Sequence, residues 1–290
     1  MKNSEILSVG SLVIDEINGN KSIGGAATNV AVNINTLGGR SALLTGLSHE
    51  SVSQEFVDYL AQLEIPVHSL SKLLSELPKC VIHIDKDGKE EGYDWYGNGI
   101  EELFQSSEID NEFIRSFPQV YLAICETTYA SRLAKSLYSE QILSFNPGSR
   151  VFESTAAFRE VQMRANYIFL NEKEYGHLIS EGLTQEPQDL ILRQDQVAVI
   201  TRGNKDTWLI TVKGIKQFTP EDITAVDETG AGDSFASAFT WARSQDIPLE
   251  KSVNLGNLLA SFVVQQVGSH INKDTQQKFI TEANKRDYLR

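Results

Sequence analysis

The chain has 290 residues, of which 41% are hydrophobic and 22% charged, as in a soluble globular protein with one large α/β domain or a main domain with a small appendage. Its 26 Lys and Arg residues against 39 Asp and Glu residues give a formal charge of −13, which repels nucleic acid and anionic lipid, so we expect neither as a partner. The same charge repels a polyanionic nucleotide, so a nucleotide site would have to rely on local backbone N–H groups, helix N-termini, a few basic side chains and a metal ion.

The cysteines and the first residues bear on the compartment. Cys80 and Cys125 are too few for a disulfide framework or a metal cluster, which indicates a reducing compartment. The stretch ending at Gly10 lacks the apolar core of a signal peptide, and no apolar run approaches the ~18 residues that span a bilayer. We therefore expect a cytoplasmic protein.

Short apolar, β-branched runs alternate along the chain with segments of helical periodicity. The clearest expected strands are Ile6–Val9, Ala42–Thr45, Val81–Ile84, Gln119–Ile124, Ile142–Phe145, Tyr167–Leu170, Val197–Thr201 and Thr207–Val212. Helices are expected over Thr28–Leu37, ended by Gly38-Gly39, and over Ser234–Ser244. This alternation predicts an α/β fold with a mostly parallel central sheet, helices on both faces, and ligands at the carboxyl ends of the strands.

The stretch Cys80–Gly97 breaks the alternation. It reads as a hairpin with a turn at Lys86-Asp87-Gly88 and a second strand that carries Tyr93, Trp95 and Tyr96. An ordinary edge hairpin and a small β lid over the active site are both open, and the aromatic tip favours the lid. We expect a single domain over residues 1–290, with a lid formed mainly by residues 80–97 and residues 11–22 as a further candidate. A homodimer through exposed edges of this hairpin is a further expectation.

The segment from Asp227 to Phe235, DETGAGDSF, carries the strongest chemical signal. Small residues directly before a helix let the backbone approach a ligand, and successive N–H groups at a helix N-terminus bind anions. Asp233 in the first turn has two explanations. It can cap the helix and interact with the helix dipole. It can also accept the proton of an alcohol while the neighbouring amides hold a transferring phosphoryl group.

This segment resembles the C-terminal signature D-x-T-G-A-G-D-x-F of the ribokinase-like carbohydrate kinases, the PfkB family. The resemblance implies a ribokinase-like three-layer sandwich with a small β lid. It implies that Asp233 is the general base and that the amides of Gly230, Ala231 and Gly232 form an anion hole for the γ-phosphoryl group of ATP. The implied acceptor is a hydroxyl group of a small sugar, with a nucleoside as the alternative. Mg²⁺ is implied as a cofactor, and so is a monovalent cation such as K⁺ at Asp227.

A second block resembles the N-terminal signature of the family. It runs GGAATNVA from Gly24 to Ala31 and ends at Leu37-Gly38-Gly39. Paired glycines open a helix whose first turn carries an amide able to bind hydroxyl groups, although a purely structural strand-to-helix turn would look the same. The resemblance implies that Gly24, Gly25 and Asn29 bind the substrate, together with Asp15 after the first strand.

Further motifs resemble the nucleotide-binding and metal-binding positions of the family. Asn171-Glu172-Lys173-Glu174 follows a strand and matches the family motif N-x-x-E, whose two polar side chains share a helix face and could address one hydrated Mg²⁺. An N-cap with an acidic first turn is the alternative. The resemblance assigns Glu174 to Mg²⁺ through water. It assigns Asn171, Thr201, Gly203 and Asn257 to the nucleotide.

The chain also departs from the family pattern. Leu47 to Ser51 stand after Gly46 where the family shows a second Gly, an Asp and another Gly. The lid strand carries Lys79-Cys80 in place of a small residue, Asp206-Thr207 replace a glycine, and the Asn146–Arg150 turn matches only partly. These departures leave the substrate open and do not touch the base or the anion hole.

Other classes fit less well. The chain has no G-x-x-x-x-G-K-[ST] motif and no protein-kinase catalytic loop. Gly230-Ala231-Gly232 is a bare G-x-G late in the chain, which argues against a dinucleotide oxidoreductase. A ribokinase-fold protein that binds a sugar or nucleoside without turnover is the non-enzyme alternative, and the intact Asp233 beside the glycines argues against it.

Overall fold

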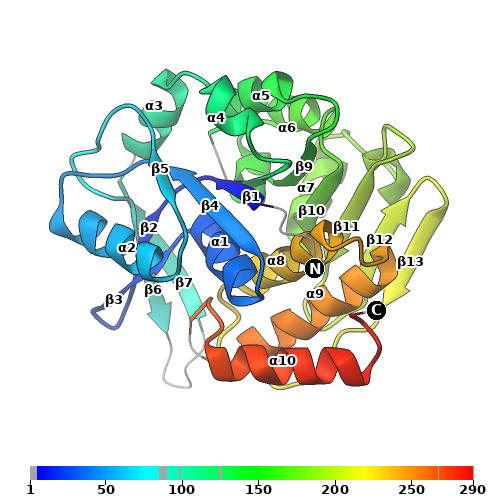
Figure 1. Ribbon diagram of the computed structural model, residues 1–290. Coiled ribbons are helices and arrows are strands. Elements are labelled where there is room, and N and C mark those ends of the chain that lie inside the picture. The colour runs from blue at the N-terminus through cyan, green and yellow to red at the C-terminus, as the bar shows by residue number, and fades with distance from the viewer. Residues whose placement is uncertain (1–4, 85–89, 98, 124–125, 267, 290) are drawn as a thin grey trace.

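The computed structural model describes residues 5–84, 90–97, 99–123, 126–266 and 268–289 as three layers, a nine-stranded sheet between two layers of helices (Figure 1). The strand order is β13-β12-β11-β10-β9-β8-β1-β4-β5. The strands are β1 (Glu5–Val9), β4 (Arg40–Thr45), β5 (Val67–Ser69), β8 (Gln119–Ala123), β9 (Ile142–Asn146), β10 (Tyr167–Asn171), β11 (Val197–Thr201), β12 (Thr207–Thr211) and β13 (Gly214–Phe218). Neighbours from β5 to β11 are parallel, and β12 and β13 extend the sheet antiparallel. The predicted mostly parallel sheet is confirmed.

Successive residues of the strands supply two separate cores. In β1, Ile6 belongs to the core on one face and Leu7 to the core on the other, because side chains alternate along a strand. The first core lies under α1 (Ala26–Thr36), α2 (Ser51–Gln62), α8 (Ala231–Ser244), α9 (Leu249–Val263) and α10 (Lys273–Lys285). The second lies under α3 (Gly99–Ser106), α4 (Asn111–Arg115), α5 (Thr127–Ser136), α6 (Thr155–Gln162) and α7 (Glu172–Ser180). The described residues also form two 3₁₀ helices, η1 (Gly148–Phe152) and η2 (Pro187–Leu190).

Helix α1 shows how the sequence sets an element boundary. Gly38 has φ 86°, in the left-handed region, and its N–H donates to the carbonyl of Asn35. The N–H of Gly39 donates to the carbonyl of Ile34 at 2.9 Å, which completes a Schellman motif. The predicted stop at Gly38-Gly39 is therefore confirmed, and the helix begins two residues earlier than expected.

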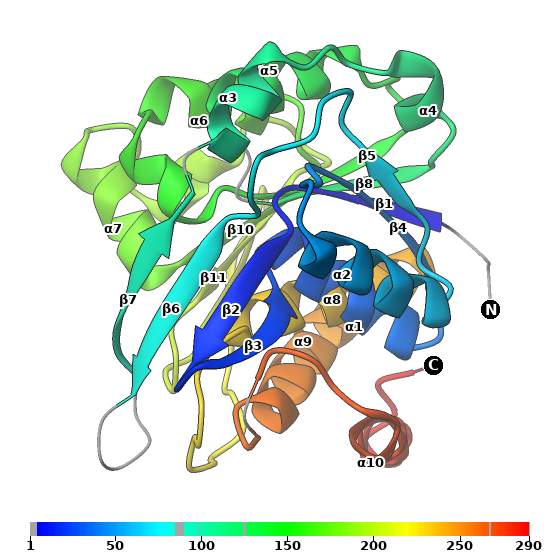
Figure 2. The ribbon, with the colours of Figure 1, turned by 90° about the vertical axis from the view of Figure 1, so that its left-hand side faces the viewer.

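A second, smaller sheet has the order β3-β2-β6-β7, and Figure 2 shows its four strands side by side next to α2. They are β2 (Val13–Ile17), β3 (Asn20–Gly24), β6 (Lys79–Ile84) and β7 (Glu90–Tyr96). The two strands of the expected hairpin pair antiparallel, and its turn at Lys86-Asp87-Gly88 lies outside the described residues. We call β3-β2-β6-β7 the small sheet.

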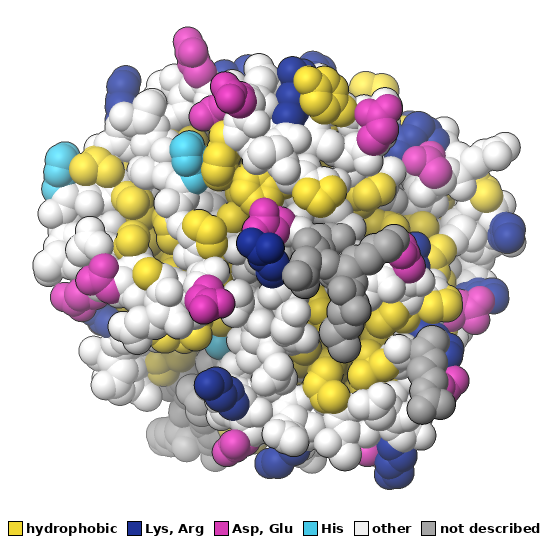
Figure 3. All heavy atoms as spheres, in the orientation of Figure 1, with side chains coloured by type: hydrophobic (Ala, Val, Ile, Leu, Met, Phe, Trp, Pro, Cys, Tyr) yellow, Lys and Arg dark blue, Asp and Glu magenta, His cyan; other side chains and the backbone are white. Residues whose placement is uncertain are grey.

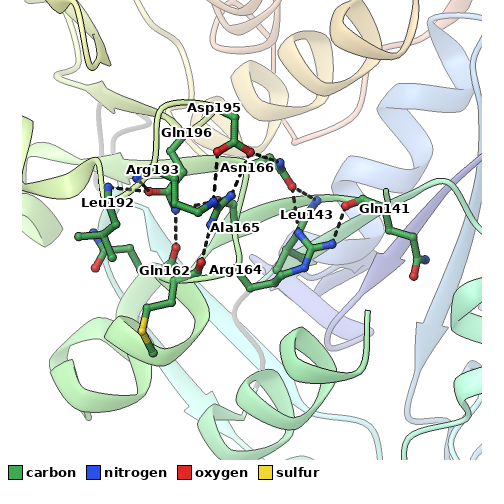
Figure 4. Close-up of polar contacts among 11 residues, drawn as sticks. Gln141, Leu143, Gln162, Arg164, Ala165, Asn166, Leu192, Arg193, Asp195 and Gln196 are labelled. Carbon is green, nitrogen blue, oxygen red and sulfur yellow. Dashed lines mark hydrogen bonds and ion pairs between the residues drawn. The ribbon is translucent and has the colours of Figure 1, made fainter. Parts of the chain in front are cut away.

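The main sheet has a switch point at β1. The chain goes from β1 to β4 and β5 on one side and then returns to β8 on the other, so ligands are expected at the carboxyl ends of β1 and β8. A polar network holds the opposite, amino ends of β9 to β11 (Figure 4). Asn166 accepts from the backbone N–H of Leu143 at 2.9 Å and donates to Asp195, and Gln196 donates to the carbonyl of Ala165 at 2.8 Å. These bonds fix the register of the strands that carry the site.

The surface in the view of Figure 1 carries mixed charge. Figure 3 shows acidic and basic side chains intermingled on this face, with hydrophobic side chains between them. Within the described part of the chain, no helix has both the length and the apolar character needed to span a bilayer.

Candidate active site

The N-terminus of α8 is shaped by one close contact. Gly230 precedes the helix with φ 74°, and a Cβ on it would lie 2.4 Å from the Cβ of Ser269. Only glycine allows this approach. The N–H of Ala231 donates to the carbonyl of Glu228 at 3.2 Å, whereas the amides of Gly232 and Asp233 belong to the first turn, where the helix supplies no acceptor. Of the three amides named from the motif, that of Ala231 is thus engaged by Glu228, and that of Gly232 lies in the first turn of the helix beside that of Asp233.

Asp233, in the first turn of α8, is held by a side chain from α1. The Nδ2 of Asn29 donates to Oδ2 of Asp233 at 2.9 Å, across 204 residues of sequence. Burial raises the pKa of Asp233 to about 6, and the hydrogen bond from Asn29 opposes that rise. A carboxyl group with this pKa is ionised at neutral pH and remains a better proton acceptor than an ordinary aspartate.

Asn29 is in turn held by the loop that follows α9. Its Oδ1 lies 2.9 Å from Ser269 Oγ and 2.9 Å from His270 Nε2. Burial lowers the pKa of His270 to about 4, so its ring is neutral at physiological pH. Asn29 and Asp233, which the sequence singles out separately for the substrate and for catalysis, are thus brought together, and sequence reasoning missed His270.

A cavity of about 450 Å³ opens between the small sheet, α2 and the loop at Ser269 and His270. Asp15 of β2 lines it, and burial together with the charge of Asp233 raises the pKa of Asp15 to about 7. The other wall carries Phe56 and Tyr59 of α2. We call this space the acceptor cavity.

The two glycines before α1 serve close packing. A Cβ on Gly24 would lie 1.9 Å from Oδ2 of Asp15, and one on Gly25, which has φ 96°, would lie 2.3 Å from the carbonyl oxygen of Ser11. The structure therefore joins the predicted residues Asp15 and Gly24, with the carboxyl group of Asp15 seated against the glycine backbone.

A second cavity, of about 200 Å³, lies at the N-terminus of α8. It is lined by the predicted residues Asn171, Glu174, Thr201 and Gly230–Asp233. We call it the donor cavity. Asn146, Gly148 and Glu228 also line it, and sequence reasoning missed them as site residues. The partial match of the turn at Asn146 and the place of Glu228 inside the glycine motif were the available signals.

Asn171 and Glu174 form a capping box at the start of α7. Asn171 Oδ1 accepts from the N–H of Glu174 at 2.9 Å, and the carboxyl oxygens of Glu174 accept from the N–H and the Nδ2 of Asn171 at 2.9 and 2.8 Å. Burial raises the pKa of Glu174, the hydrogen bonds from Asn171 lower it, and the charge of Asp233 raises it further. The capping explanation is thus realised in the structure, and it coexists with the position of Glu174 in the donor cavity.

Six predicted residues lie outside both cavity linings: Gly24, Gly25 and Asn29, described above, and Gly203, Asn257 and Asp227. Gly203 has φ 63° in the turn after β11. Asn257 of α9 is buried and accepts from Thr207 Oγ1 at 2.8 Å, while its Nδ2 has no partner among the described residues. The two carboxyl oxygens of Asp227 accept from the N–H groups of Thr229 and Gly268, each at 2.9 Å. Asp227 therefore ties together the two loops that border the site.

No three His, Cys, Asp or Glu side chains of the described residues converge as a metal cage. Both carboxyl oxygens of Glu174 are engaged by Asn171, so Glu174 fits a hydrated ion through water better than a direct metal bond. The arrangement as a whole places the Asp233 carboxyl group in the first turn of α8, in the lining of the donor cavity, and bonds it to Asn29, whose partners Ser269 and His270 line the acceptor cavity together with Asp15. Such an arrangement can move a phosphoryl group from one cavity to an alcohol in the other.

Comparisons with known proteins cover nearly the whole chain. Residues 3–276 match the family described as "pfkB family carbohydrate kinase". The chain is 30% identical over 271 residues to the nucleoside kinase of Methanocaldococcus jannaschii, which covers 91% of this chain and 86% of that protein. The nucleoside kinase of Methanothermobacter thermautotrophicus is 27% identical over 256 residues, covering 86% of this chain and 80% of that protein.

The fold has close likenesses among solved structures. The crystal structure of the M. jannaschii nucleoside kinase, described as an archaeal member of the ribokinase family, matches with a TM-score of 0.82 and 25% sequence identity. The match covers 96% of this chain and 98% of that one.

Proposed function

Because the chain belongs to the pfkB family of carbohydrate kinases, with the ribokinase-like fold that its sequence predicts, it uses ATP to phosphorylate an alcohol, and we propose that this alcohol is a hydroxyl group of a nucleoside. The sequence alone leans towards a small sugar, with a nucleoside as the alternative. The observation that carries the proposal is the composition of the acceptor cavity. Its aromatic side chains, Phe56 and Tyr59, suit a flat base, and Asp15 suits ribose hydroxyl groups.

The register of the small sheet adds aromatic surface on the same side. Cys80 pairs with both Asp15 and Trp95, and Ile82 pairs with Tyr93. Because side chains alternate along strands, Tyr93 and Trp95 share a face with Asp15, and Ile82 from this face lines the acceptor cavity. Trp95 is 41% exposed and Tyr93 59% exposed, so both are available to a ligand. This supports the proposal that the small sheet is a lid.

In the proposed mechanism, Asp15 binds acceptor hydroxyl groups and Asp233 accepts the proton of the attacking hydroxyl. The first-turn amides of α8 hold the transferring phosphoryl group from the donor cavity, where they meet developing negative charge. Mg²⁺ would neutralise phosphate charge, held by phosphate oxygens and, through water, by Glu174. The proposal includes no monovalent cation at Asp227, whose oxygens already bind two backbone N–H groups.

A panel of acceptors tests the proposal. ADP formation from Mg·ATP is measured with purine and pyrimidine ribonucleosides, ribose, fructose and other hexoses, and sugar acids. We expect kcat/KM for a nucleoside to exceed that for ribose by roughly 10-fold or more, since stacking of a base on aromatic side chains contributes ~1–3 kcal/mol. A sugar that equals or exceeds every nucleoside would overturn the nucleoside assignment. If none of the acceptors gives ADP, a binding protein without turnover would be favoured.

A further inference from the structure

We propose that His270 is a positioning residue for Asp233: it donates from Nε2 to Asn29 and thereby fixes the amide group of Asn29 so that its NH₂ faces the base. The inference rests on the proposed role of Asp233 as general base. It adds His270, which no motif of the sequence points to, and gives its neighbour Ser269 a role in holding Asn29.

The donor and the acceptor of each hydrogen bond can be assigned by starting from Asp233. An ionised carboxylate only accepts, so the end of Asn29 that lies 2.9 Å from Asp233 Oδ2 is its NH₂ group. The other end, Oδ1, only accepts, and it lies 2.9 Å from both Ser269 Oγ and His270 Nε2. His270 therefore carries its proton on Nε2. The two donors occupy both acceptor positions of the amide oxygen.

The hydrogen bond from the Asn29 amide matters because of the groups that surround Asp233. Asp15 from β2, Glu174 from α7 and Tyr121 from β8 interact electrostatically with Asp233, and none of these three groups is a cation. Burial raises the pKa of Asp233, and the hydrogen bond from Asn29 lowers it. If the amide group of Asn29 were turned by 180°, its oxygen would face the carboxylate of Asp233. The two groups would repel each other, and the pKa of Asp233 would rise.

The loop that carries the two donors is anchored on both sides. Asn33, one turn after Asn29 on α1, donates to the carbonyl of Ser269 at 3.1 Å and accepts from the N–H of Ile271 at 3.2 Å. Asp227 accepts from the N–H of Gly268 at 2.9 Å. Helix α1 therefore carries Asn29 and, through Asn33, also holds the loop that contains Ser269 and His270. This fixes the position of His270 relative to Asn29 and Asp233.

His270 also lines the acceptor cavity, so the test must separate positioning from acceptor binding. His270→Leu replaces the hydrogen-bond donor with an apolar side chain, whereas His270→Gln supplies an N–H near the position of Nε2. For His270→Leu we expect kcat to fall roughly 3- to 10-fold, the range of one lost hydrogen bond. We also expect the acid limb of its kcat–pH profile to move up by about half a unit, because the bond that lowers the pKa of Asp233 is weakened.

His270→Gln should recover most of kcat and return the acid limb to its original position. Equal losses in the Leu and Gln variants, or a change in acceptor KM alone, would overturn the positioning role and leave His270 as a cavity wall. Thermal unfolding of both variants shows whether either loss is one of folding.

A second measurement is independent of turnover, and so separates this inference from the proposed function. In ¹⁵N-labelled protein, the ring nitrogens of His270 report the tautomer directly. We expect a protonated Nε2 and a bare Nδ1 from pH 5.5 to 8, since burial keeps the ring neutral. A proton on Nδ1 would contradict the inference, even in an enzyme that phosphorylates nucleosides.

Discussion

Two carboxyl groups of the site, Asp15 and Asp233, share an unusual electrostatic state. Burial raises the pKa of Asp233 to about 6 and that of Asp15 to about 7, and the charge of Asp233 adds to the shift of Asp15. A raised pKa means that the ionised form is less stable in the folded protein than in the unfolded chain. At neutral pH the site therefore lowers the folding stability of the protein in order to hold reactive carboxylates.

The pH dependence of stability follows with a definite sign. The stabilising contribution of each protonated group is fully present below the ordinary aspartate pKa of 3.8 and is lost as pH rises through the folded values of about 6 and 7. Asp15→Asn should therefore raise the Tm at pH 8 and raise it less at pH 5.5. The exposed Asp222→Asn is the matched control, with a small and equal change at both pH values. A gain for Asp15→Asn that does not depend on pH would contradict the burial of this charge.

Residue-level roles were only partly accessible from the sequence. The motif around Asp233 and the glycines before α1 stand in contiguous segments, so their spacing could be compared with a family pattern. The contact of His270 and Ser269 with Asn29 joins residues about 240 positions apart, and no local pattern encodes it. At Glu174 the sequence left a cap and a metal-binding role open, because the same two side chains satisfy both.

At the scale of elements, the small sheet presents different aromatic residues on its two faces. Its register sets Trp95 on the face of Asp15 and the neighbouring Tyr96 on the opposite face, where Lys79 lies over the Tyr96 ring. β7 thus carries exposed aromatic residues on both sides, Tyr93 and Trp95 on one and Tyr96 on the other. A homodimer through this sheet stays a prediction.

Trp95→Ala should raise the KM of the acceptor roughly 10-fold or more, since loss of one partly buried aromatic contact costs ~1–3 kcal/mol, and should leave the KM of ATP nearly unchanged. Tyr96→Ala is the control, because it removes a similar area from the other face. If both variants raise the acceptor KM equally, or neither does, the small sheet does not act as a lid over the acceptor.

The start of α7 allows the cap and the metal role of Glu174 to be separated. Glutamine also completes a capping box, so Glu174→Gln should keep the wild-type Tm. Loss of its charge should raise the Mg²⁺ concentration needed for half-maximal activity by several-fold if Glu174 holds a hydrated ion. Glu172→Gln in the same turn, whose carboxylate pairs with Arg202 and Lys205, serves as control. An unchanged Mg²⁺ requirement in Glu174→Gln would leave the residue as a helix cap alone.

The sequence predicts the long elements well and the short ones poorly. Seven strands of the main sheet (β1, β4, β8, β9, β10, β11 and β12) are apolar runs, and their boundaries lie close to those expected, as at Val197–Thr201. β5 has three residues, and β3 and β13 carry exposed polar residues, so neither length nor apolar content marks them. Which sheet the hairpin of β6 and β7 joins is decided by its pairing with β2, a tertiary contact.

At the scale of the whole molecule, the fold places Asp233 in the lining of the donor cavity and connects it, through Asn29 and His270, to the acceptor cavity. The switch point of the main sheet opens its carboxyl edge, α8 presents its N-terminus there, and α1 brings Asn29 to the same place. The acceptor cavity lies towards the small sheet and the donor cavity towards α7 and β11. The formal charge of −13 opposes ATP at long range, so binding must come from the local amides and a divalent ion.

The central claim is that Asp233 is the base of a phosphoryl transfer, and Asp233→Asn tests it most directly. Asparagine fits the first turn of a helix and can still accept from Asn29, so the variant should melt at or above the wild-type Tm and bind Mg·ATP with a similar Kd. Because the amide cannot take the proton of the attacking hydroxyl, kcat measured with saturating acceptor at pH 8 should fall by ~10²-fold or more. A folded, ATP-binding Asp233→Asn variant that keeps more than about a tenth of the wild-type kcat would contradict the account.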